Sequence, residues 1–594
     1  MFSDIKEFEV QSGDSALTQA ERDLIEKHRK GEPCVLNKGE RPEKETESTS
    51  IRASLLQLLI TGASPESNLL RFGVHLEGGW IKGKLDLSFA TARGRTILDA
   101  CHFPEKPNLF HAKLRNLSLQ RCYLPGLEAG AIEVDGAVIM RDTISVGEIQ
   151  FPVARIGHKL DMNGAKLEGK IGDGRWRRAL YIERAWIGNS ILLRRINAIG
   201  KITVTGTRIG GVFAINNSFI DGKIENGKWG SAIVAERIVV SASVNLKELK
   251  TIGRITFTGA QIGGQLDCTG MVLSGKTNES EWGIAFLGER IDVKERLIWR
   301  NIQILGGRIN FNSARIGYLV DDFESWPRGN EDQLRLDGFV YNRIAAEAMV
   351  MVPVRRRLDW LAQAKQLGAV SSQPYTQLAH VLRGMGHDRD ARKVLIERER
   401  LTALQSRKNR RVVPNGDWGV AFRSIWADLV NPIAWFTDLL IRQLTGYGYR
   451  AHNSFIALAL LIGFAWVLAG TAWNEGSFAP NSDVILTSRE WRSLVGRDCL
   501  PKASDGCIVN PAELWSSHEY DGFDWDSFHA AAYAADLVVP VLSLGQTDAW
   551  APSRDRGFWG GVLWWARWLF AALGWIVTAF GAAAITGIIQ KERE

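Results

Sequence analysis

The chain has 594 residues, of which 45% are hydrophobic and 23% charged, and its formal net charge is +7. This length predicts several domains, and the apolar and charged fractions exclude a disordered or collagen-like chain. The excess positive charge is small and scattered, so it does not indicate nucleic acid as a partner. Many of the 22 tryptophans lie in the last 170 residues, a bias that is typical of a membrane interface.

The first ten residues contain charges and no apolar core segment, so we expect no signal peptide. Most of the chain is therefore expected to begin in the cytosol. Four separated cysteines in the first half are expected to be reduced: Cys34, Cys101, Cys122 and Cys268. No Cys-x-x-Cys or Cys/His spacing indicates a metal site, and the ten histidines do not cluster. We therefore predict no metal and no cofactor.

Residues 1–66 are predicted to form a helical cap. Thr18 and Glu21 have the spacing of a capping box, and Gly31 is expected to end that helix. A second helix is predicted over residues 51–60, with its leucines on one face and Gly62 at its end.

Residues 67–335 have the texture of a parallel β-solenoid. Short apolar strands alternate with Gly, Asn and Asp, and a phrase close to Ile-Gly-Gly-x-Leu-Asp recurs at irregular intervals near 20 residues or multiples of it. Its copies begin at Trp80, Arg155, Arg208, Gln261 and Arg315. A single coil cannot bury its own apolar face, so we expect stacked neighbours to form the core.

The pattern becomes helical again after the solenoid. Residues 336–412 are predicted to be a helical hairpin adaptor, with Pro374 in a first helical turn and breaks at Gly384 and Gly386. A basic run at residues 407–411 leads into a Trp-bearing juxtamembrane amphipathic helix, which we place within residues 413–452 on the inner membrane surface.

Residues 453–594 are predicted to be a membrane domain with two spans, residues 455–473 and 568–589, which contain no charge. Basic residues flank both spans on one side, so that side is expected to be cytoplasmic and the loop 474–557 extracytoplasmic. This loop holds 13 acidic and 6 basic residues. In an oxidising compartment Cys499 and Cys507 would form a short-loop disulfide, the alternative being two free thiols.

Residues 527–544 form a third apolar stretch. A full crossing would place the basic C-terminal flank outside, so we predict a re-entrant helix followed by a returning loop. This layout is that of pore-loop channel subunits, although the loop does not match the potassium filter TVGYG. Two spans cannot enclose a pore, so conduction requires a homo-oligomer.

A polar path is predicted along this stretch. Asp526, His529, Tyr533 and Asp536 have the spacing of one helical face, and ionisable groups at membrane depth indicate an ion, proton or quinone path. The alternative is a helix that only faces an aqueous vestibule. The return loop adds Gln546 and Asp548, and Asp536 or Asp548 would form an acidic collar that favours cations in a ring of subunits.

One further motif matches the phosphate-binding loop pattern. It runs from Gly270 through Gly275, Lys276 and Thr277, but a P-loop needs a helix after it and the following residues have a loop-like composition. A chance match in a glycine-rich chain is the alternative to nucleotide binding.

Several phrases carry a resemblance to a family. They are Leu124-Pro125-Gly126-Leu127, the repeated Ile-Gly-Gly-x-Leu, Gln373-Pro374-Tyr375-x-Gln377-Leu378, Tyr533-x-x-Asp536-x-x-x-Pro540, Leu544-Gly545-Gln546 and Thr586-Gly587. The chain thereby resembles uncharacterised bacterial membrane proteins that join pentapeptide-like or solenoid repeats to a C-terminal membrane hairpin. The resemblance implies the bacterial inner membrane, with the solenoid in the cytoplasm. Some members are labelled membrane-associated oxidoreductases, but no cofactor fingerprint supports that label in these residues.

Three functional hypotheses follow from the sequence. The first is a non-enzymatic protein whose cytosolic solenoid docks an unknown protein or ligand and whose oligomeric pore-loop-like module conducts ions or perturbs the bilayer. The second is a membrane-bound oxidoreductase using quinone near His529, Tyr533 and Asp536. The third is an anchored interaction scaffold whose membrane hairpin has no transport role.

Overall fold

A computed structural model describes residues 17–62, 73–92, 94–171, 175–328, 333–345, 353–364, 371–410, 435–495 and 510–586. These residues divide into two compact units, Met1–Leu395 and Ile396–Glu594. Each unit is described by itself.

The described N-terminal residues of the first unit include the helices α2 (Gln19–Lys30) and α3 (Ala53–Thr61). The predicted capping box is confirmed, because the Thr18 hydroxyl accepts from the Glu21 amide while the Glu21 carboxylate accepts from the Thr18 amide. Residues predicted as purely helical also form β1 (Cys34–Val35), the 3-10 helix η1 (Asn37–Gly39) and β2 (Ser50–Arg52). The helix expected from residue 51 therefore starts two residues later, after β2.

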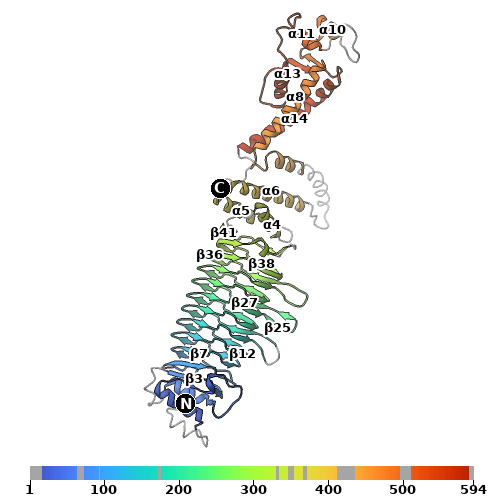
Figure 1. Cartoon of the computed structure of the whole chain (residues 1–594). Helices are drawn as coiled ribbons and strands as arrows, with labels where there is room; N and C mark the ends of the chain where they lie inside the picture. The colour runs from blue at the N-terminus through green and yellow to red at the C-terminus, as the bar shows by residue number, and fades with distance from the viewer. Residues whose placement is uncertain are drawn as a thin grey trace, which may run out of the picture. The chain divides into compact units, whose positions relative to one another are not determined.

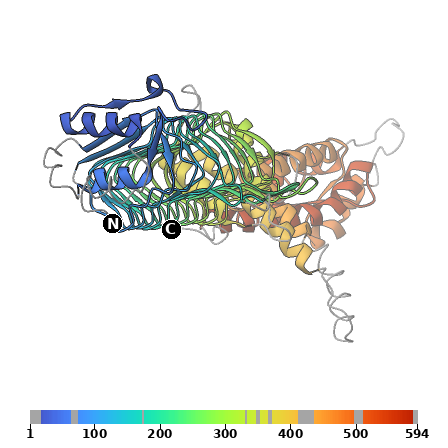
Figure 2. The same cartoon turned by 90° about the horizontal axis from the view of Figure 1, so that it is seen from below.

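A parallel β-solenoid follows, as the sequence predicts. Figures 1 and 2 show its strands stacked in successive coils, with the N-terminal helices at one end of the stack. One coil runs through β10 (Glu133–Val134), β11 (Val138–Ile139), β12 (Ile144–Ser145) and β13 (Ile149–Gln150). Each of these strands pairs in parallel with its counterpart in the next coil: β14 (Arg155–Ile156), β15 (Leu160–Asp161), β16 (Lys166–Glu168) and β17 (Arg178–Tyr181). Each coil therefore has four short sides, and its hydrogen bonds run to the coils before and after it.

The strands belong to three large sheets. The 20-stranded sheet contains β1, β3 (Gly73–Glu77), β5 (Arg95–Asp99), β6 (Lys113–Leu114), β7 (Leu117–Ser118), β10 (Glu133–Val134), β11 (Val138–Ile139), β14 (Arg155–Ile156), β15 (Leu160–Asp161), β18 (Trp186–Ile187), β19 (Ile191–Leu192), β22 (Arg208–Ile209), β23 (Phe213–Ala214), β28 (Val239–Val240), β29 (Val244–Asn245), β32 (Gln261–Ile262), β33 (Leu266–Asp267), β36 (Asp292–Trp299), β39 (Arg315–Asp321) and β41 (Val340–Ile344). The 8-stranded sheet contains β8 (Tyr123–Leu124), β12 (Ile144–Ser145), β16 (Lys166–Glu168), β20 (Asn197–Ile199), β24 (Phe219–Asp221), β30 (Lys250–Ile252), β34 (Val272–Ser274) and β37 (Gln303–Gly306). The 9-stranded sheet contains β9 (Leu127–Glu128), β13 (Ile149–Gln150), β17 (Arg178–Tyr181), β21 (Lys201–Thr203), β27 (Ser231–Val234), β31 (Arg254–Thr256), β35 (Ile284–Leu287), β38 (Arg308–Asn310) and β40 (Leu334–Arg335). Two small sheets pair β2 with β4 (Trp80–Lys82) and β25 (Lys223–Glu225) with β26 (Lys228–Trp229).

The core of the solenoid consists of ladders of buried side chains, in which residues at the same position of successive coils stack on one another. One ladder runs through Val134, Ile156, Ile187, Ile209, Val240, Ile262, Val293 and Ile316, which are paired strand to strand. All eight side chains are buried. β-Branched residues suit this position because their stiff side chains pack on the same residue type one strand away.

The coils alternate in length, which explains the irregular spacing of the recurring phrase. Glu133, Arg155, Trp186, Arg208, Val239, Gln261 and Asp292 share one register position, so successive coils take 22 and 31 residues in turn. Each longer coil carries an insertion whose two ends pair in antiparallel, and we call these insertions the arms: residues 170–176, 223–229 and 276–282. The phrases at Arg155, Arg208 and Gln261 recur at every second coil.

The coils turn at corners where the backbone is left-handed. One corner column is occupied by Ala131, Val153, Arg184, Gly206, Arg237, Gly259, Arg290, Ser313 and Gly338, all with positive φ. Val153 is the unfavourable member of this column, because a β-branched residue has φ +57° there and its side chain is 57% exposed. The conformation is thus dictated by the coil rather than by the residue.

The solenoid ends later than the sequence indicates. β41 pairs in parallel with β39, so coil structure extends to Ile344 and the adaptor begins after it rather than at residue 336. The 3-10 helix η3 (Phe323–Ser325) and helix α4 (Val354–Gln363) close this end over an aromatic cluster. Trp326 stacks on Trp299 and contacts Trp360, with ring centroids 5.3 Å apart in each pair.

The described residues of the adaptor form the helices α4, α5 (Gln373–Gly384) and α6 (Asp388–Arg410). Helix α5 is docked on β41 by a hydrogen bond of 2.7 Å from the Gln377 amide to the Tyr341 carbonyl. The predicted break is confirmed, because α5 ends at Gly384 and Gly386 has φ +82°.

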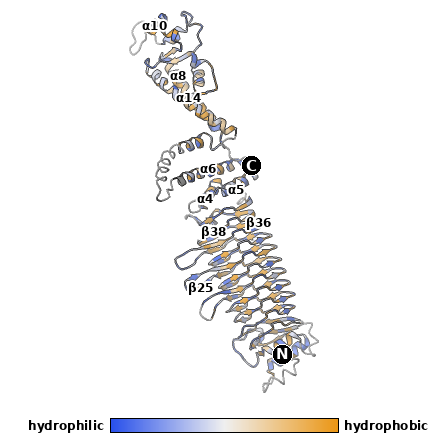
Figure 3. Cartoon of the chain, turned by 180° about the vertical axis from the view of Figure 1, so that it is seen from behind, coloured by the Kyte–Doolittle hydropathy of each residue, from blue (hydrophilic) through white to orange (hydrophobic). Residues whose placement is uncertain are grey.

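The second unit contains two long apolar helices, α8 (His452–Asn474) and α14 (Phe558–Ile585), each long and apolar enough to cross a membrane. Figure 3 shows hydrophobic residues along the ribbon of α14. Many large apolar side chains on both helices are exposed, among them Leu460, Phe464, Trp568 and Trp575. In front of α8, residues 435–444 are helical; residues 411–434 of the predicted juxtamembrane helix lie outside the described part of the chain.

The segment between α8 and α14 forms a small aromatic-rich subdomain. It contains α9 (Asp483–Thr487), α10 (Arg489–Val495), α11 (Pro511–Trp515), α12 (Ala530–Val538), α13 (Gln546–Ala549) and the antiparallel pair β42 (Phe478–Pro480) and β43 (Trp550–Pro552). Its core includes Phe478, Trp491, Trp515 and Trp550. Glu475 ties this subdomain to α14, because its carboxylate accepts from the amides of Phe558 and Trp559 at the start of that helix.

Candidate functional site

The residues of the predicted polar path lie around α12, but they do not share one helical face. The helix covers only Ala530–Val538, and His529 is its N-cap in an extended conformation, with φ −123° and ψ 104°. Asp526 therefore precedes the helix, and only Tyr533 and Asp536 lie on it. The prediction of four residues on one face is wrong, because the 3.6-residue spacing continues into residues that are not helical.

Asp536 holds the returning loop. Its carboxylate accepts hydrogen bonds from the Leu544 amide at 2.9 Å, and from the Thr547 amide and hydroxyl at 2.8 Å each. Backbone donors from the segment that follows α12 thus surround a charged acceptor, an arrangement in which such bonds are strongest. Asp536 braces the loop against the helix.

Gln546 returns the chain to the start of α12. Its side-chain carbonyl accepts from the His529 amide at 2.9 Å, and its amide group donates to the Ser527 carbonyl at 2.9 Å. The Trp550 indole donates to the Asp526 carbonyl at 2.7 Å. The chain therefore passes down α12 and comes back to the level at which it entered.

Tyr533 precedes Asp536 by three residues on α12, and its side chain is buried in the aromatic core. Its ring packs edge-on against Phe478 with centroids 5.2 Å apart, and only 2% of the residue is exposed. Its ring also packs against Phe528, with centroids 5.7 Å apart. Its position is that of a packing residue.

α12 packs closely against both long helices. A Cβ on Gly574 of α14 would overlap the carbonyl oxygen of Val538, the last residue of α12. At the other end of α12, Ala530 lies beside Gly470 of α8, and Phe528 stacks on Trp473 with centroids 4.2 Å apart. α8 and α14 are antiparallel neighbours, as the Phe464–Phe570 contact and the approach of Gly581 to Ser454 show. The end of α12 therefore reaches the middle of α14.

The remaining predicted residues are exposed. Asp526, His529 and Asp548 lie at the surface of the subdomain near the start of α12. The loop between α12 and α13 exposes apolar side chains, with Val541 84% and Leu544 47% exposed. This site thus consists of a braced helix and loop, exposed carboxylates at one end and an exposed apolar loop edge.

The segment that matches the P-loop pattern lacks the helix that such a loop requires. Gly270, with φ +72°, is a coil corner, and Gly275 is the base of the third arm. Thr277 lies within the third arm, which is followed by β35, and residues 277–287 contain no helix. The amides that would cradle phosphate at a helix N-terminus are therefore not arranged here.

The arms account for the motif instead. Gly-Lys pairs at 169–170, 222–223 and 275–276 are each followed by a tryptophan, at 176, 229 and 282, so the unit repeats every 53 residues. Lys223 lies over the Trp176 ring at 4.3 Å, and Lys276 lies over the Trp229 ring at 4.6 Å. Lys276 thus links the third arm to the second by a cation–π contact. An internal comparison at a spacing of 53 could have found this pattern.

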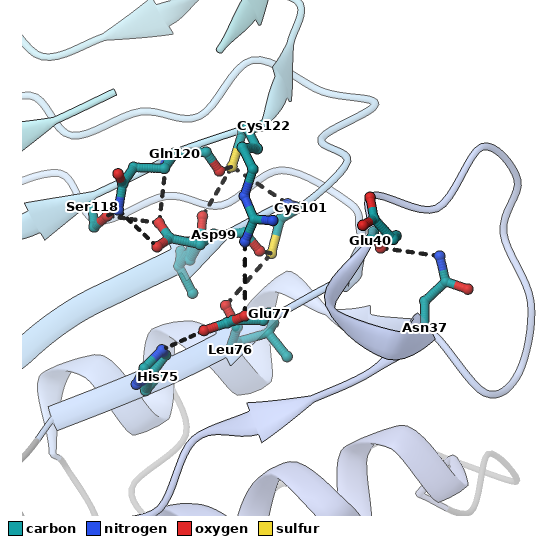
Figure 4. Close-up of polar contacts among 12 residues, drawn as sticks. Asn37, Glu40, His75, Leu76, Glu77, Asp99, Cys101, Ser118, Gln120 and Cys122 are labelled. Carbon is teal, nitrogen blue, oxygen red and sulfur yellow. Dashed lines mark hydrogen bonds and ion pairs between the residues drawn. The ribbon is translucent and has the colours of Figure 1, made fainter. Parts of the chain in front are cut away.

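A second polar cluster, drawn in Figure 4, lies within the first coils of the solenoid. The Asp99 carboxylate accepts from the Ser118 hydroxyl at 2.6 Å and from the Gln120 amide at 3.0 Å. The Cys122 thiol donates to the Leu98 carbonyl at 2.9 Å, and burial raises the pKa of this thiol well above its usual range. The bonds of Asp99 with Ser118 and Gln120, and of Cys122 with Leu98, join neighbouring coils and so stabilise the stack.

The cysteines of the described part of the chain are unpaired. Cys34, Cys101, Cys122 and Cys268 are free and buried, in agreement with the expectation of reduced thiols. Cys499 and Cys507 lie outside the described residues, so their disulfide stays a prediction. Within the described ranges, no group of three or more His, Cys, Asp or Glu side chains is placed to hold a metal ion.

Three comparisons were made with known proteins. No family model, no curated protein and no solved structure matches this chain.

Proposed function

We propose that this protein is a membrane-anchored solenoid whose C-terminal unit assembles into an oligomeric, pore-loop-type module that conducts ions. In this proposal α8 and α14 cross the bacterial inner membrane, and the solenoid is cytoplasmic. The exposed apolar side chains of both helices support the membrane assignment, because such faces are unfavourable in water. The family resemblance described above is part of the same proposal.

The observation that carries the pore-loop assignment is the closed path of the chain around α12. This helix ends opposite the middle of α14, and Asp536 and Gln546 then fix the return to its starting level. Irregular backbone at membrane depth is tolerated where protein or water satisfies its polar groups. The hydrogen bonds to Asp536 provide part of that satisfaction, so a re-entrant segment is physically acceptable here.

Oligomerisation follows from the apolar loop edge. Val541, Leu542 and Leu544 are exposed together on one loop, while Phe478, Trp491, Trp515 and Trp550 of the same subdomain form a core. Val484, Leu486 and Phe523 are exposed elsewhere in the subdomain. We propose that neighbouring copies meet around this edge, which would place the loop near a symmetry axis. The exposed carboxylates of Asp526 and Asp548 would then lie near the entrance and favour cations.

The roles of the two carboxylates predicted as a collar therefore separate. Asp548 is exposed and is the better candidate for a selectivity residue, whereas Asp536 is committed to the loop. We propose Asp536 as a positioning residue, which acts on conduction only through the shape of the loop.

The test is cation flux in liposomes that contain the full-length protein, combined with its oligomeric state in detergent and nanodiscs. We expect an oligomer, cation flux, and weaker cation selectivity in Asp548→Asn. Asp524→Asn is the matched control, because Asp524 is also an exposed carboxylate of this subdomain. Asp536→Asn should lower flux and also increase hydrogen exchange in residues 539–547, a change that the control should not produce. A monomer without flux would refute the conduction proposal.

The anchored scaffold is retained as a second candidate because of one observation. The exposed part of the loop is apolar at Val541, Leu542 and Leu544, and apolar side chains offer no ligands to a permeating ion. An oligomer that shows no flux would favour this function. No arrangement of the described residues specifically favours the oxidoreductase hypothesis.

A further inference from the structure

A row of basic and aromatic side chains lies on the last coils of the solenoid. Arg296 of β36 pairs in register with Tyr318 of β39, and Tyr318 pairs with Arg343 of β41. An irregularity in β36 between Val293 and Arg296 sets this register. Residues in register on neighbouring parallel strands project to the same side, so these three side chains form one stripe.

The stripe lines a cavity. The cavity has a volume of about 670 Å³ and is bounded by Arg296, Arg300, Tyr318 and Arg343, with Ile344 and Met385 among its apolar lining residues. Met385 follows the last residue of α5, so the cavity is formed by the solenoid together with the adaptor. Its size lies within the range of cavities that bind small molecules.

The charge of the cavity is uncompensated. Its lining contains three arginines and no acidic side chain. Among the described residues, none of the three arginines forms an ion pair. The Nε–H of Arg300 is buried and has no hydrogen-bond partner. A buried donor without a partner is unfavourable, and three guanidinium groups around one cavity repel each other, so an anion that enters would relieve both effects.

We propose that this cavity binds a phosphorylated small molecule of nucleotide size. Guanidinium groups match the paired oxygens of phosphate, and a di- or triphosphate supplies enough negative charge for three of them. The Tyr318 ring and the apolar side chains of Ile344 and Met385 would contact the uncharged part of the ligand. The site is separate from the residues 270–277 that match the P-loop pattern.

Binding to this cavity would join the last coils to the adaptor. Arg296, Tyr318 and Arg343 come from three coils of the solenoid, whereas Met385 belongs to the turn between α5 and α6. A ligand that contacts both sides should therefore slow local opening of that turn. This gives a readout that does not depend on ion flux.

The test is isothermal titration of the full-length protein in detergent with ADP, pyrophosphate and citrate. We expect ADP and pyrophosphate to bind and citrate to bind at least tenfold more weakly. Arg296→Gln and Arg343→Gln should each weaken ADP binding by about tenfold or more, because each removes a charged hydrogen-bonding group. Tyr318→Ala should weaken ADP binding but leave pyrophosphate binding within about twofold, since only ADP has a base and a sugar.

Arg208→Gln is the matched control, because Arg208 is an exposed strand arginine of an earlier coil outside the cavity. Hydrogen exchange of residues 371–395 should slow when ADP is added to the wild type and to Arg208→Gln, and not in Arg343→Gln. Absence of ADP and pyrophosphate binding would overturn the proposal, as would binding that Arg296→Gln and Arg343→Gln leave unchanged. Equal binding of citrate and pyrophosphate would overturn the assignment to phosphate.

Discussion

The buried ion pair between Asp321 and Arg357 should control the attachment of α4 to the end of the solenoid. The two guanidinium nitrogens of Arg357 donate to the two carboxylate oxygens of Asp321 at 2.7 Å each. The side chains are 6% and 0% exposed for Arg357 and Asp321. The Trp326 indole also donates to Asp321 at 2.7 Å, so this carboxylate organises both α4 and the aromatic cluster.

The magnitude follows from burial. Arg357→Met leaves a buried carboxylate without its counter-charge, and breaking a pair in this way costs about 3–5 kcal/mol. Asp321→Asn leaves the guanidinium buried but keeps an oxygen for Trp326. In the double variant Asp321→Asn/Arg357→Met no charge is buried, and such replacements are often close to neutral. We therefore expect the double variant to be more stable than either single variant.

The assay is hydrogen exchange of residues 353–364 in the full-length protein, since exchange reports local opening of α4. A loss of about 3–5 kcal/mol corresponds to exchange that is about 150 to 5,000 times faster in Arg357→Met. Arg328→Met is the control, because Arg328 pairs with Glu324 at the surface and exposed pairs contribute at most about 1 kcal/mol. Wild-type exchange rates in Arg357→Met, or effects of the two single variants that add up in the double variant, would refute the reasoning.

Three further predictions concern other parts of the chain. Gly574→Ala should lower the thermal midpoint of the membrane unit in detergent, because the new Cβ would overlap Val538. The control Gly463→Ala should leave the midpoint unchanged or raise it, since no atom lies near the new Cβ there. Equal midpoints of the two variants would argue against the close packing of α12 on α14. Val153→Gly should stabilise the solenoid by about 0.5–1 kcal/mol in urea unfolding, because glycine adopts the left-handed conformation of this position without strain. Val146→Gly should instead destabilise the solenoid. A loss of stability in Val153→Gly would contradict the inference that Val153 is strained. Burial tends to raise the pKa of Glu21, but hydrogen bonds from Arg52 and Thr18 outweigh burial and hold that pKa below its usual value of 4.5. The ionised Glu21 side chain therefore contributes its full stability above pH 4.5, and this contribution is lost as the pH falls through the folded pKa. The difference in hydrogen exchange of residues 17–31 between wild type and Glu21→Gln should shrink below about pH 4.5, and a difference that is constant with pH would exclude this role.

The solenoid could be predicted because its signal is local and repeated. The recurring Ile-Gly phrase at Arg155, Arg208 and Gln261 marks one register position in every second coil, and alternation of apolar residues specifies the inward side. The alternation in coil length could not be recognised from the recurring phrase. Each arm inserts residues whose ends pair with each other and not with the ladders of the coils. The end of the solenoid was also missed, since β41 is defined by its partner β39 and not by its own composition.

The two candidate sites show the limit of reading residues from spacing alone. The positions of Tyr533 and Asp536 on α12 follow from the helical period, but the role of Asp536 depends on Thr547, which reaches it only because the chain turns back. The arginine cavity is even harder to predict from the sequence. Arg296 and Arg343 are 47 residues apart in sequence, and only the strand register brings them to one stripe.

The two-coil periodicity also determines how the length of this protein can change. Each 53-residue unit brings one long coil, one short coil and one Lys–Trp arm, and it contacts only its neighbours. Duplication or deletion of one whole unit would preserve every ladder and every arm contact, and would change the axial rise by two strand spacings, about 10 Å. Gain or loss of a single coil would instead bring two arm-bearing coils, or two armless ones, into direct succession. Only insertions or deletions of two successive coils therefore preserve the alternation of long and short coils.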